Sequence, residues 1–293
     1  MPEKYSFGLL GYPLGHSLSP QIHAAALQTL GLQGNYHLYP VEHEKELPEI
    51  INQLRQGTIQ GLNVTIPYKR SVIDFMDVLT PTARSIGAIN TISSRQNQLI
   101  GDNTDAGGFL ADLRRLSWSS EGDQLQHALV LGAGGSARAV AYALFKQGWQ
   151  LTIAARRIEQ AEVLGKSLTN LLTRRDEQSL VEYINLDRTA LSNFRRAPNL
   201  IVNTTPLGIY PHENANPWPN GLALPAQAAV YDLVYNPVET EFTCAAREAG
   251  LRTASGIGML VEQAALSFEI WTGQSAPRTE MHASLAAYRT GAR

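Results

Sequence analysis

Polar side chains gather in four short segments in the first third of the chain. Ser17 and Ser19 stand one residue apart in an extended segment, so both hydroxyls face the same side. Residues 63–69 read Asn-Val-Thr-Ile-Pro-Tyr-Lys after an apolar run, Asn90 follows another such run, and residues 102–105 read Asp-Asn-Thr-Asp. Open α/β sheets bind ligands at the carboxyl ends of their strands. Hydroxyls, amides, a carboxylate and one ammonium at strand ends suit a small polyhydroxylated acid.

Each of these residues also has a structural alternative. Ser19 could be the N-cap of the helix that opens beside Pro20. Asp105 could be the N-cap of the helix predicted at 106–116. Lys69 could be a solvated helix residue, but it is one of only five lysines in the chain, which favours a role in the motif.

A glycine-rich loop follows the apolar strand predicted at 127–131 and leads into a helix predicted at 136–147. The loop residues are Gly132, Ala133, Gly134, Gly135, Ser136 and Ala137. Gly132 permits a tight turn, Gly134 lets the backbone approach a pyrophosphate, and Ala137 lets the helix pack on the strand. The anion would lie on the N–H groups that begin the helix. A glycine turn without a ligand is the alternative, and the strand–loop–helix order favours dinucleotide binding.

The end of the next strand, predicted at 150–155, indicates which dinucleotide. An NAD enzyme usually carries Asp or Glu here to accept from the ribose 2′-hydroxyl. This chain has Ala155, Arg156, Arg157 and Ile158 instead. No carboxylate repels a 2′-phosphate, and two guanidinium groups can bind one. The sequence therefore predicts NADP, with a solvated helix start as the alternative for the two arginines.

Composition limits the class of protein. The chain has 293 residues, enough for two domains, and 44% are hydrophobic, which excludes a disordered chain. The formal net charge of −2 speaks against nucleic acid or an anionic membrane as the main partner. The single Cys244 cannot form an internal disulfide, and no apolar run is long enough for a membrane span. We expect a soluble cytoplasmic protein with a small-molecule substrate and, lacking any ligand-spaced cluster, no metal.

Strands that alternate with helices predict an α/β protein with mainly parallel sheets. In the first half we expect strands at 5–10, 36–41, 61–65, 88–93 and 98–101, with helices from 19 to Gly31, at 44–55 and at 67–76. The two strands 88–93 and 98–101 form a hairpin around Gln96 and Asn97. After a polar stretch at 117–126 we expect strands at 127–131, 150–155, 181–185, 200–203 and 229–234, with helices at 136–147, 159–172, 256–272 and 278–288. Residues 206–225 form a long loop.

The motifs resemble, in order from about residue 5 to residue 270, those of the shikimate dehydrogenase family. The Asn-Val-Thr…Lys and Asn-Thr-Asp elements are far more specific than the glycine loop. The matching segments are 15–20, 63–69, 87–91, 101–105, 132–135, 203–208, 231–235 and 256–263.

The resemblance implies a two-domain fold with the active site in the cleft between the domains. Residues 1–105 with 257–293 would form an α/β substrate-binding domain, to which a C-terminal helix returns. Residues 106–256 would form an NADP-binding Rossmann domain.

The resemblance also implies an activity, the reversible reduction of 3-dehydroshikimate to shikimate by NADPH, in aromatic amino acid biosynthesis. Lys69 would be the catalytic acid–base and Asp105 its partner. The substrate contacts would be Ser17, Ser19, Thr65, Asn90, Asp105, Tyr235 and Gln263. Further cofactor contacts would be Thr204, Leu233 and Gly256, besides the glycine loop and residues 155–157.

Three alternatives stay open. The first is a quinate/shikimate dehydrogenase of relaxed specificity; the Ser-x-Ser pair and Ile158, where NAD-accepting relatives can carry Asp, favour shikimate and NADP. The second is a non-catalytic NADP-binding regulator, which would not need the Lys69 and Asp105 pair. The third is an NADP enzyme acting on folates, for which the hydroxyl-rich set is a poorer match. The sequence leaves monomer and homodimer open.

Overall fold

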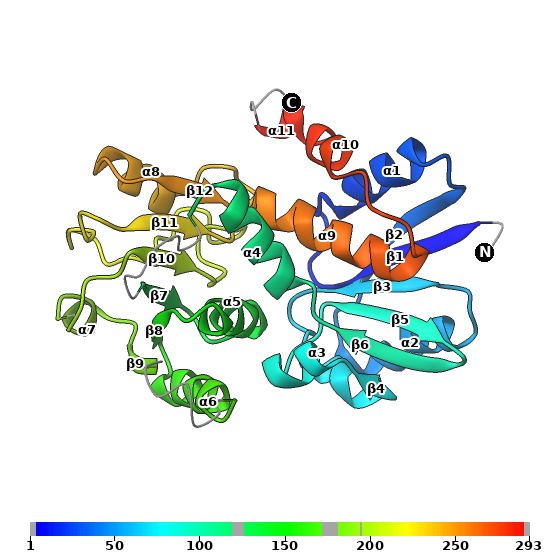
Figure 1. The fold of residues 1–293 in the computed structure, drawn as a ribbon, viewed down its shortest axis with the longest axis horizontal. Coiled ribbons are helices and arrows are strands. Elements are labelled where there is room, and N and C mark those ends of the chain that lie inside the picture. Colours follow the sequence, from blue (N-terminus) through cyan, green and yellow to red (C-terminus); the bar gives the residue numbers. More distant parts are fainter. Residues whose placement is uncertain (1–3, 119–125, 172–180, 194, 290–293) are drawn as a thin grey trace. The chain divides into compact units, whose positions relative to one another are not determined.

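The computed structural model divides the chain into two compact units, Met1–Ala111 with Leu260–Arg293, and Asp112–Met259. Helices α4 (Asp105–Arg115) and α9 (Ile257–Thr272) carry the chain from one unit to the other (Figure 1). The division thus falls inside these two helices, a few residues after the expected boundaries. The structure describes residues 4–118, 126–171, 181–193 and 195–289, so most of the polar stretch at 117–126 lies outside the described residues.

The first unit contains a six-stranded mixed sheet in the order β2-β1-β3-β5-β6-β4. Its strands are β1 (Tyr5–Gly11), β2 (Gly34–Pro40), β3 (Gly61–Val64), β4 (Val78–Leu79), β5 (Thr91–Arg95) and β6 (Gln98–Asp102). Strand β1 pairs in parallel with β2 and β3, and β4 with β6, while β5 is antiparallel to both its neighbours. The predicted hairpin is confirmed: Gln96 and Asn97 have φ of 49° and 62°, the left-handed conformation that two-residue hairpin turns require.

The helices of the first unit differ from the prediction in one important place. They are α1 (Ser19–Thr29), η1 (Glu44–Glu46), α2 (Leu47–Arg55), η2 (Ser71–Phe75), α3 (Pro81–Ile86), α9, α10 (Arg278–Ala283) and α11 (Ala286–Arg289). The helix predicted at 67–76 is wrong: a turn is followed by the short 3₁₀ helix η2. The carbonyl of Lys69 accepts from the N–H of Ile89 at 2.7 Å, so it is not used in an α-helical ladder. Strand β4 and helix α3 were not predicted.

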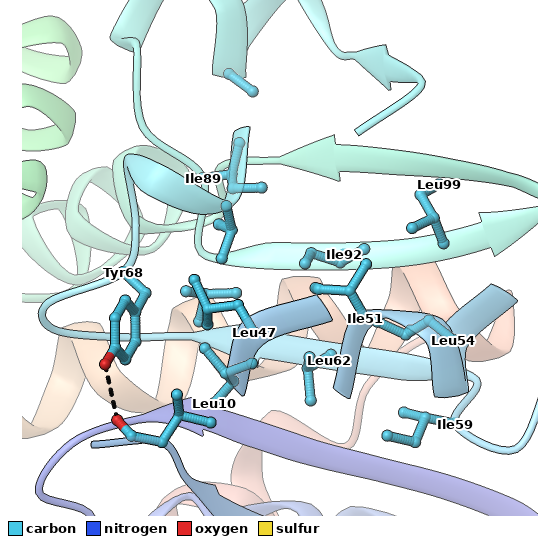
Figure 2. Packing of buried hydrophobic residues seen from close by; sticks show 14 residues of the cluster. Leu10, Leu47, Ile51, Leu54, Ile59, Leu62, Tyr68, Ile89, Ile92 and Leu99 are labelled. Carbon is cyan, nitrogen blue, oxygen red and sulfur yellow. Dashed lines mark hydrogen bonds between the residues drawn. The ribbon is translucent and has the colours of Figure 1, made fainter. Parts of the chain in front are cut away.

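The core on one side of this sheet explains how the segment after β3 is held (Figure 2). Leu47, Ile51 and Leu54 of α2 are buried against the sheet, in one cluster with Leu62. Tyr68 inserts its ring into the same cluster, and its hydroxyl donates to the carbonyl of Val41 at 2.9 Å. A buried ring with its polar end satisfied is a rigid anchor, so the residue after Tyr68 is held in place by the core.

The second unit contains a six-stranded sheet that is parallel throughout, in the order β12-β11-β10-β7-β8-β9. This is the strand order of a dinucleotide-binding Rossmann fold. The strands are β7 (His127–Leu131), β8 (Gln150–Ala155), β9 (Val181–Asn185), β10 (Leu200–Asn203), β11 (Ala229–Asp232) and β12 (Thr253–Ser255). The helices are α5 (Gly135–Lys146), α6 (Ile158–Thr169), α7 (Arg188–Leu191) and α8 (Glu241–Glu248). Elements α7, α8 and β12 were not predicted, whereas the five predicted strands are all present.

In the part of the chain that the structure describes, no helix has both the length and the apolar character required to cross a membrane.

Candidate active site

The first unit joins Lys69 and Asp105 in a buried ion pair. Lys69 Nζ donates to Asp105 Oδ2 at 2.6 Å, and the two side chains are only 12% and 6% exposed. The pair is therefore largely removed from water. Buried ion pairs attract each other more strongly than exposed ones, but they depend on further hydrogen bonds to offset the cost of desolvation. The buried Tyr68 and the bond between Ile89 N–H and the Lys69 carbonyl fix the lysine backbone.

Asp105 is available for this contact because another residue caps its helix. Asn103 Oδ1 accepts from the N–H of Ala106 at 3.3 Å, and Asp105 is itself the first residue of α4. The alternative interpretation of Asp105 as an N-cap is therefore wrong. Its second oxygen, Oδ1, accepts from Asn90 Nδ2 at 2.9 Å.

The amide of Asn90 has only one possible orientation. Its Oδ1 accepts from the backbone N–H of Thr104 at 2.7 Å, and a backbone N–H can only donate. Asn90 Nδ2 must then face Asp105 Oδ1, and also Gln263 Oε1 at 3.1 Å. Gln263 is oriented in the same way, since its Nε2 donates to the carbonyl of Leu260 at 2.8 Å. Four of the predicted site residues thus form one buried cluster of Lys69, Asp105, Asn90 and Gln263.

Helix α9 brings Gln263 to the cluster from a distant part of the sequence. Trp271, further along the helix, donates from Nε1 to the carbonyl of Ile92 at 3.0 Å and stacks on Phe7 with ring centroids 4.8 Å apart. Its ring occupies the space above Gly61, where any Cβ would collide with it. Closer to Gln263, Gly108 of α4 lies so near that a Cβ there would approach Gln263 N to 2.6 Å. Small residues thus let α9 lie against the strands and α4.

The three predicted hydroxyl residues lie in the same unit, Ser17 and Thr65 in loops and Ser19 as the first residue of α1. Thr65 directly follows β3, and its N–H donates to the carbonyl of Leu10 at 2.9 Å. Ser17 Oγ accepts from the N–H of Ser19 at 3.3 Å. The N-cap of α1 is Leu18, without a side-chain cap, so the prediction of Ser19 as N-cap is wrong. Within the described residues the Ser19 and Thr65 hydroxyls make no hydrogen bond, and neither joins the Lys69 cluster directly.

The glycine loop of the second unit fits a pyrophosphate. Gly132 has φ of +112°, which L side chains rarely adopt, and a Cβ there would lie 2.6 Å from Thr204 Oγ1. Gly134 has open space where a Cβ would stand, with nothing within 4 Å, and it immediately precedes the twelve-residue helix α5. Ala137, in the first turn of α5, is fully buried. An open, side-chain-free approach to a helix N-terminus is the geometry that anion binding requires.

The two arginines stand where the prediction requires them. Ala155 is the buried last residue of β8, and Arg156 and Arg157 form the exposed bend before α6. In the described part of the chain, neither guanidinium makes a hydrogen bond or an ion pair, and no carboxylate competes for them there. The charge arrangement therefore fits a 2′-phosphate.

The remaining predicted residues follow the ends of β10 and β11. Thr204 comes directly after β10, and its hydroxyl donates to the carbonyl of Leu131 at 2.6 Å, beside the glycine loop. Leu233 directly follows β11, and its carbonyl lies so close to Gly256 that only glycine fits there. Tyr235 is two residues further on and half-buried.

A buried carboxylate that the sequence analysis missed, Asp232, fixes these strand ends. Its Oδ1 accepts from Asn203 Nδ2 at 2.8 Å and from the N–H of Val234 at 3.0 Å, and its Oδ2 from Thr240 Oγ1 at 2.7 Å. It has no exposed surface. Burial raises the pKa of Asp232 from 3.8 to about 6, although these three hydrogen bonds lower it. A polar residue at the end of an otherwise apolar strand was the available signal.

This raised pKa predicts a pH dependence of stability. Between about pH 4 and 6 the folded chain holds a proton on Asp232 that the unfolded chain has lost, so the free energy of unfolding falls as pH rises. Raising the pKa of Asp232 from 3.8 to about 6 corresponds to about 3 kcal/mol of unfolding free energy. Asp232→Asn should remove this fall, measured as the melting temperature from pH 4 to 7. Asp74→Asn, at an exposed position on η2, is the control; an equal change of slope in both variants would contradict the assignment.

The parallel Rossmann sheet, the glycine loop and the buried lysine–aspartate pair define a dinucleotide-dependent oxidoreductase with a separate α/β unit for its substrate. Two family models match the chain: the shikimate dehydrogenase substrate binding domain at residues 9–92, and the shikimate 5′-dehydrogenase C-terminal domain at residues 256–286. The chain belongs to the shikimate dehydrogenase family.

Individual relatives are similar over nearly the whole chain. The shikimate dehydrogenase (NADP(+)) of Carboxydothermus hydrogenoformans is 43% identical over 272 residues, 92% of each chain. That of Bacillus subtilis is 36% identical over 98% of each chain. Among solved structures, shikimate 5-dehydrogenase of Thermus thermophilus, in complex with NADP(H) and shikimate, is 34% identical with a TM-score of 0.82. The match covers 97% of this chain and 99% of that one.

Proposed function

We propose that this chain catalyses the reversible, NADP-dependent reduction of 3-dehydroshikimate to shikimate, in aromatic amino acid biosynthesis. The observation that carries the proposal is the buried Lys69–Asp105 pair at 2.6 Å, hydrogen-bonded onward to Asn90, in a chain of this family. We assign substrate binding chiefly to the first unit and cofactor binding to the second, which also contains Tyr235.

Lys69 acts as the acid–base in this proposal. NADPH, when bound, supplies the hydride that reduces the substrate ketone. The oxygen of that ketone gains negative charge, and the Lys69 ammonium stabilises the charge and donates a proton; in the oxidising direction the neutral amine takes the proton back. Asp105 accepts one N–H of the ammonium and so orients the other two.

The substrate is a ring with several hydroxyl groups and a carboxylate, and we propose that hydroxyl and amide side chains recognise it. Ser19 and Thr65 support this, because their hydroxyls have no hydrogen-bond partner among the described residues. The proposed substrate contacts are Ser17, Ser19, Thr65, Asn90, Asp105, Tyr235 and Gln263.

The proposed cofactor contacts lie in the second unit, whose geometry supports them. The loop from Gly132 to Ala137 would hold the pyrophosphate at the start of α5, and Arg156 with Arg157 would bind the 2′-phosphate. Thr204, Leu233 and Gly256 support the loop or lie at the adjoining strand ends, and we propose them as contacts toward the nicotinamide.

The test is nicotinamide absorbance with purified protein. Shikimate and quinate are each offered with NADP⁺ and with NAD⁺. Turnover with shikimate and NADP⁺ alone supports the proposal, and comparable turnover with quinate or NAD⁺ replaces it with an enzyme of relaxed specificity. Binding of NADPH without turnover of any pair would indicate a regulator instead.

The cellular setting is part of the proposal. The net charge of −2 and the single cysteine support a cytoplasmic enzyme whose partners are small molecules rather than nucleic acid. Sedimentation velocity distinguishes the monomer from the homodimer.

A further inference from the structure

Three buried hydroxyls form a triangle beneath the Lys69 cluster. The oxygen of Ser267 lies 2.8 Å from that of Thr91 and 3.1 Å from that of Thr104, and the two threonine oxygens are 3.1 Å apart. Thr91 and Ser267 have no exposed surface, and Thr104 is 4% exposed. The three come from β5, from the loop before α4 and from α9, so the triangle joins three distant parts of the first unit.

The side chain of Asn63 donates to the triangle from one side. Asn63 Nδ2 donates to Ser267 Oγ at 2.9 Å and to Thr91 Oγ1 at 3.2 Å. The orientation of this amide is fixed, because the same Nδ2 donates to the backbone carbonyl of Asn90 at 3.1 Å. Its Oδ1 accepts from the hydroxyl of Tyr36 at 2.9 Å. Ser267 Oγ thus serves as an acceptor for Asn63.

The hydrogen of Ser267 is directed elsewhere. Its hydroxyl donates to the carbonyl of Gln263, one turn earlier in α9, at 3.0 Å. A hydroxyl has one hydrogen and two lone pairs. With its hydrogen on Gln263, Ser267 can also accept from Thr91 or Thr104.

On its other side the triangle reaches Asn90. Thr91 Oγ1 and Thr104 Oγ1 lie 3.1 and 3.2 Å from Asn90 Oδ1. Each hydroxyl has one hydrogen, so a Thr104 that donates to Ser267 Oγ, 3.1 Å away, does not also donate to Asn90 Oδ1. Asn90 Nδ2 in turn donates to Thr104 Oγ1 at 2.9 Å and to Asp105 Oδ1. A continuous path of buried hydrogen bonds therefore runs from Ser267 through Thr104 and Asn90 to Asp105.

We propose that Ser267 is a positioning residue for the reaction, acting through the two threonines on Asn90 and so on the carboxylate that orients Lys69. Among the described residues, Ser267 makes no hydrogen bond to Lys69 or Asp105, so its effect on the reacting groups is indirect. The inference rests on the proposed function, since it concerns the efficiency of the same site. The sequence offered one signal for it: Ser267 stands four residues after Gln263, on the same face of the helix.

The physical reason is that loss of this hydroxyl leaves buried polar groups without partners. Asn63 Nδ2 would lose its shortest acceptor and Thr91 its shortest contact. Buried polar networks are costly when partly satisfied, so the remaining side chains would shift to find new partners. Asn90 would shift with them. Displacement of a positioned group by about 1 Å can lower a rate by about 10²-fold.

The experiment compares Ser267→Ala with Thr272→Ala, a matched control on the same helix. Thr272 is also buried, and its hydroxyl likewise donates to the carbonyl four residues earlier, Phe268, at 2.8 Å. It is outside the triangle. With shikimate as varied substrate, Ser267→Ala should lower kcat/KM about tenfold, with KM for NADP⁺ within twofold of wild type. Thr272→Ala should leave both values near wild type, although its melting temperature should be similar to that of Ser267→Ala.

Further variants distinguish rescue of the activity from failure of the inference and from failure of the proposed function. Ser267→Cys keeps a small donor and acceptor and should recover part of the loss. A kcat/KM for shikimate within twofold of wild type in Ser267→Ala overturns the inference, even if the variant melts earlier. Should Ser267→Ala not fold, Thr91→Val removes a second member of the triangle and is judged by the same criteria. Absence of shikimate oxidation by the wild-type chain would instead overturn the proposed function.

Discussion

Lys69→Ala is expected to lower kcat for shikimate oxidation about 10³-fold, with KM for shikimate within about threefold of wild type. General acid–base catalysis contributes about 10²–10⁴-fold, and the Lys69 ammonium is the group hydrogen-bonded to Asp105 in the buried cluster. A loss in kcat indicates a role in the transition state, whereas a large rise in KM with intact kcat would make Lys69 a binding residue.

The stability of the Lys69→Ala variant must be measured separately from its activity. Removing Lys69 leaves Asp105, 6% exposed, as an unpaired buried carboxylate, and breaking a buried pair in this way costs about 3–5 kcal/mol. The double variant Lys69→Ala/Asp105→Asn removes that charge and should regain stability without regaining activity. Lys166→Ala is the control, because its pair with Glu162 has the same length of 2.6 Å but is exposed. It should leave kcat, KM and the melting temperature unchanged.

Replacing both Arg156 and Arg157 by alanine is expected to abolish the preference for NADP⁺ over NAD⁺. Each hydrogen bond to a charged group contributes about 1.5–3 kcal/mol, so losing two guanidinium–phosphate contacts should lower kcat/KM for NADP⁺ by about 10²-fold or more. The value for NAD⁺, which has no 2′-phosphate, should stay within about threefold. Initial rates with each cofactor at fixed shikimate measure the ratio.

Single variants show which arginine carries the contact. Arg195→Ala is the matched control, since Arg195 is an exposed arginine of the same unit, paired with Glu182 at 3.6 Å. If the double variant keeps the wild-type cofactor preference, the two arginines are a solvated helix start and the 2′-phosphate is bound elsewhere. High salt should weaken NADP⁺ binding more in the wild type than in the double variant. Salt screens the attraction between the two arginines and the 2′-phosphate, and the double variant lacks these arginines.

Much of the fold was predictable because the local sequence patterns agreed with the packing of the strands and helices. Buried parallel strands are apolar along their length, and the run at 127–131 ends at Gly132, where a positive φ and the closeness of Thr204 require glycine. Conflicts arose where tertiary contacts overrode propensity. The predicted helix at 67–76 is replaced by a turn, because the Lys69 carbonyl is bonded to Ile89 and Tyr68 is held in the core. Helix α8, with only eight residues, has too short a pattern to stand out.

The sequence by itself determined which chemical groups are present: a glycine loop, two arginines after a strand, and a lysine with two carboxamides and a carboxylate in short polar motifs. Residue type and local spacing suffice for those, since loop and strand conformations are set by neighbours in the chain. Only the tertiary structure decided which groups meet. Lys69 and Asp105 are 36 residues apart, and Thr91 and Ser267 are 176 apart. Such contacts depend on sheet order and on where α9 packs, which long-range burial selects and no local pattern encodes.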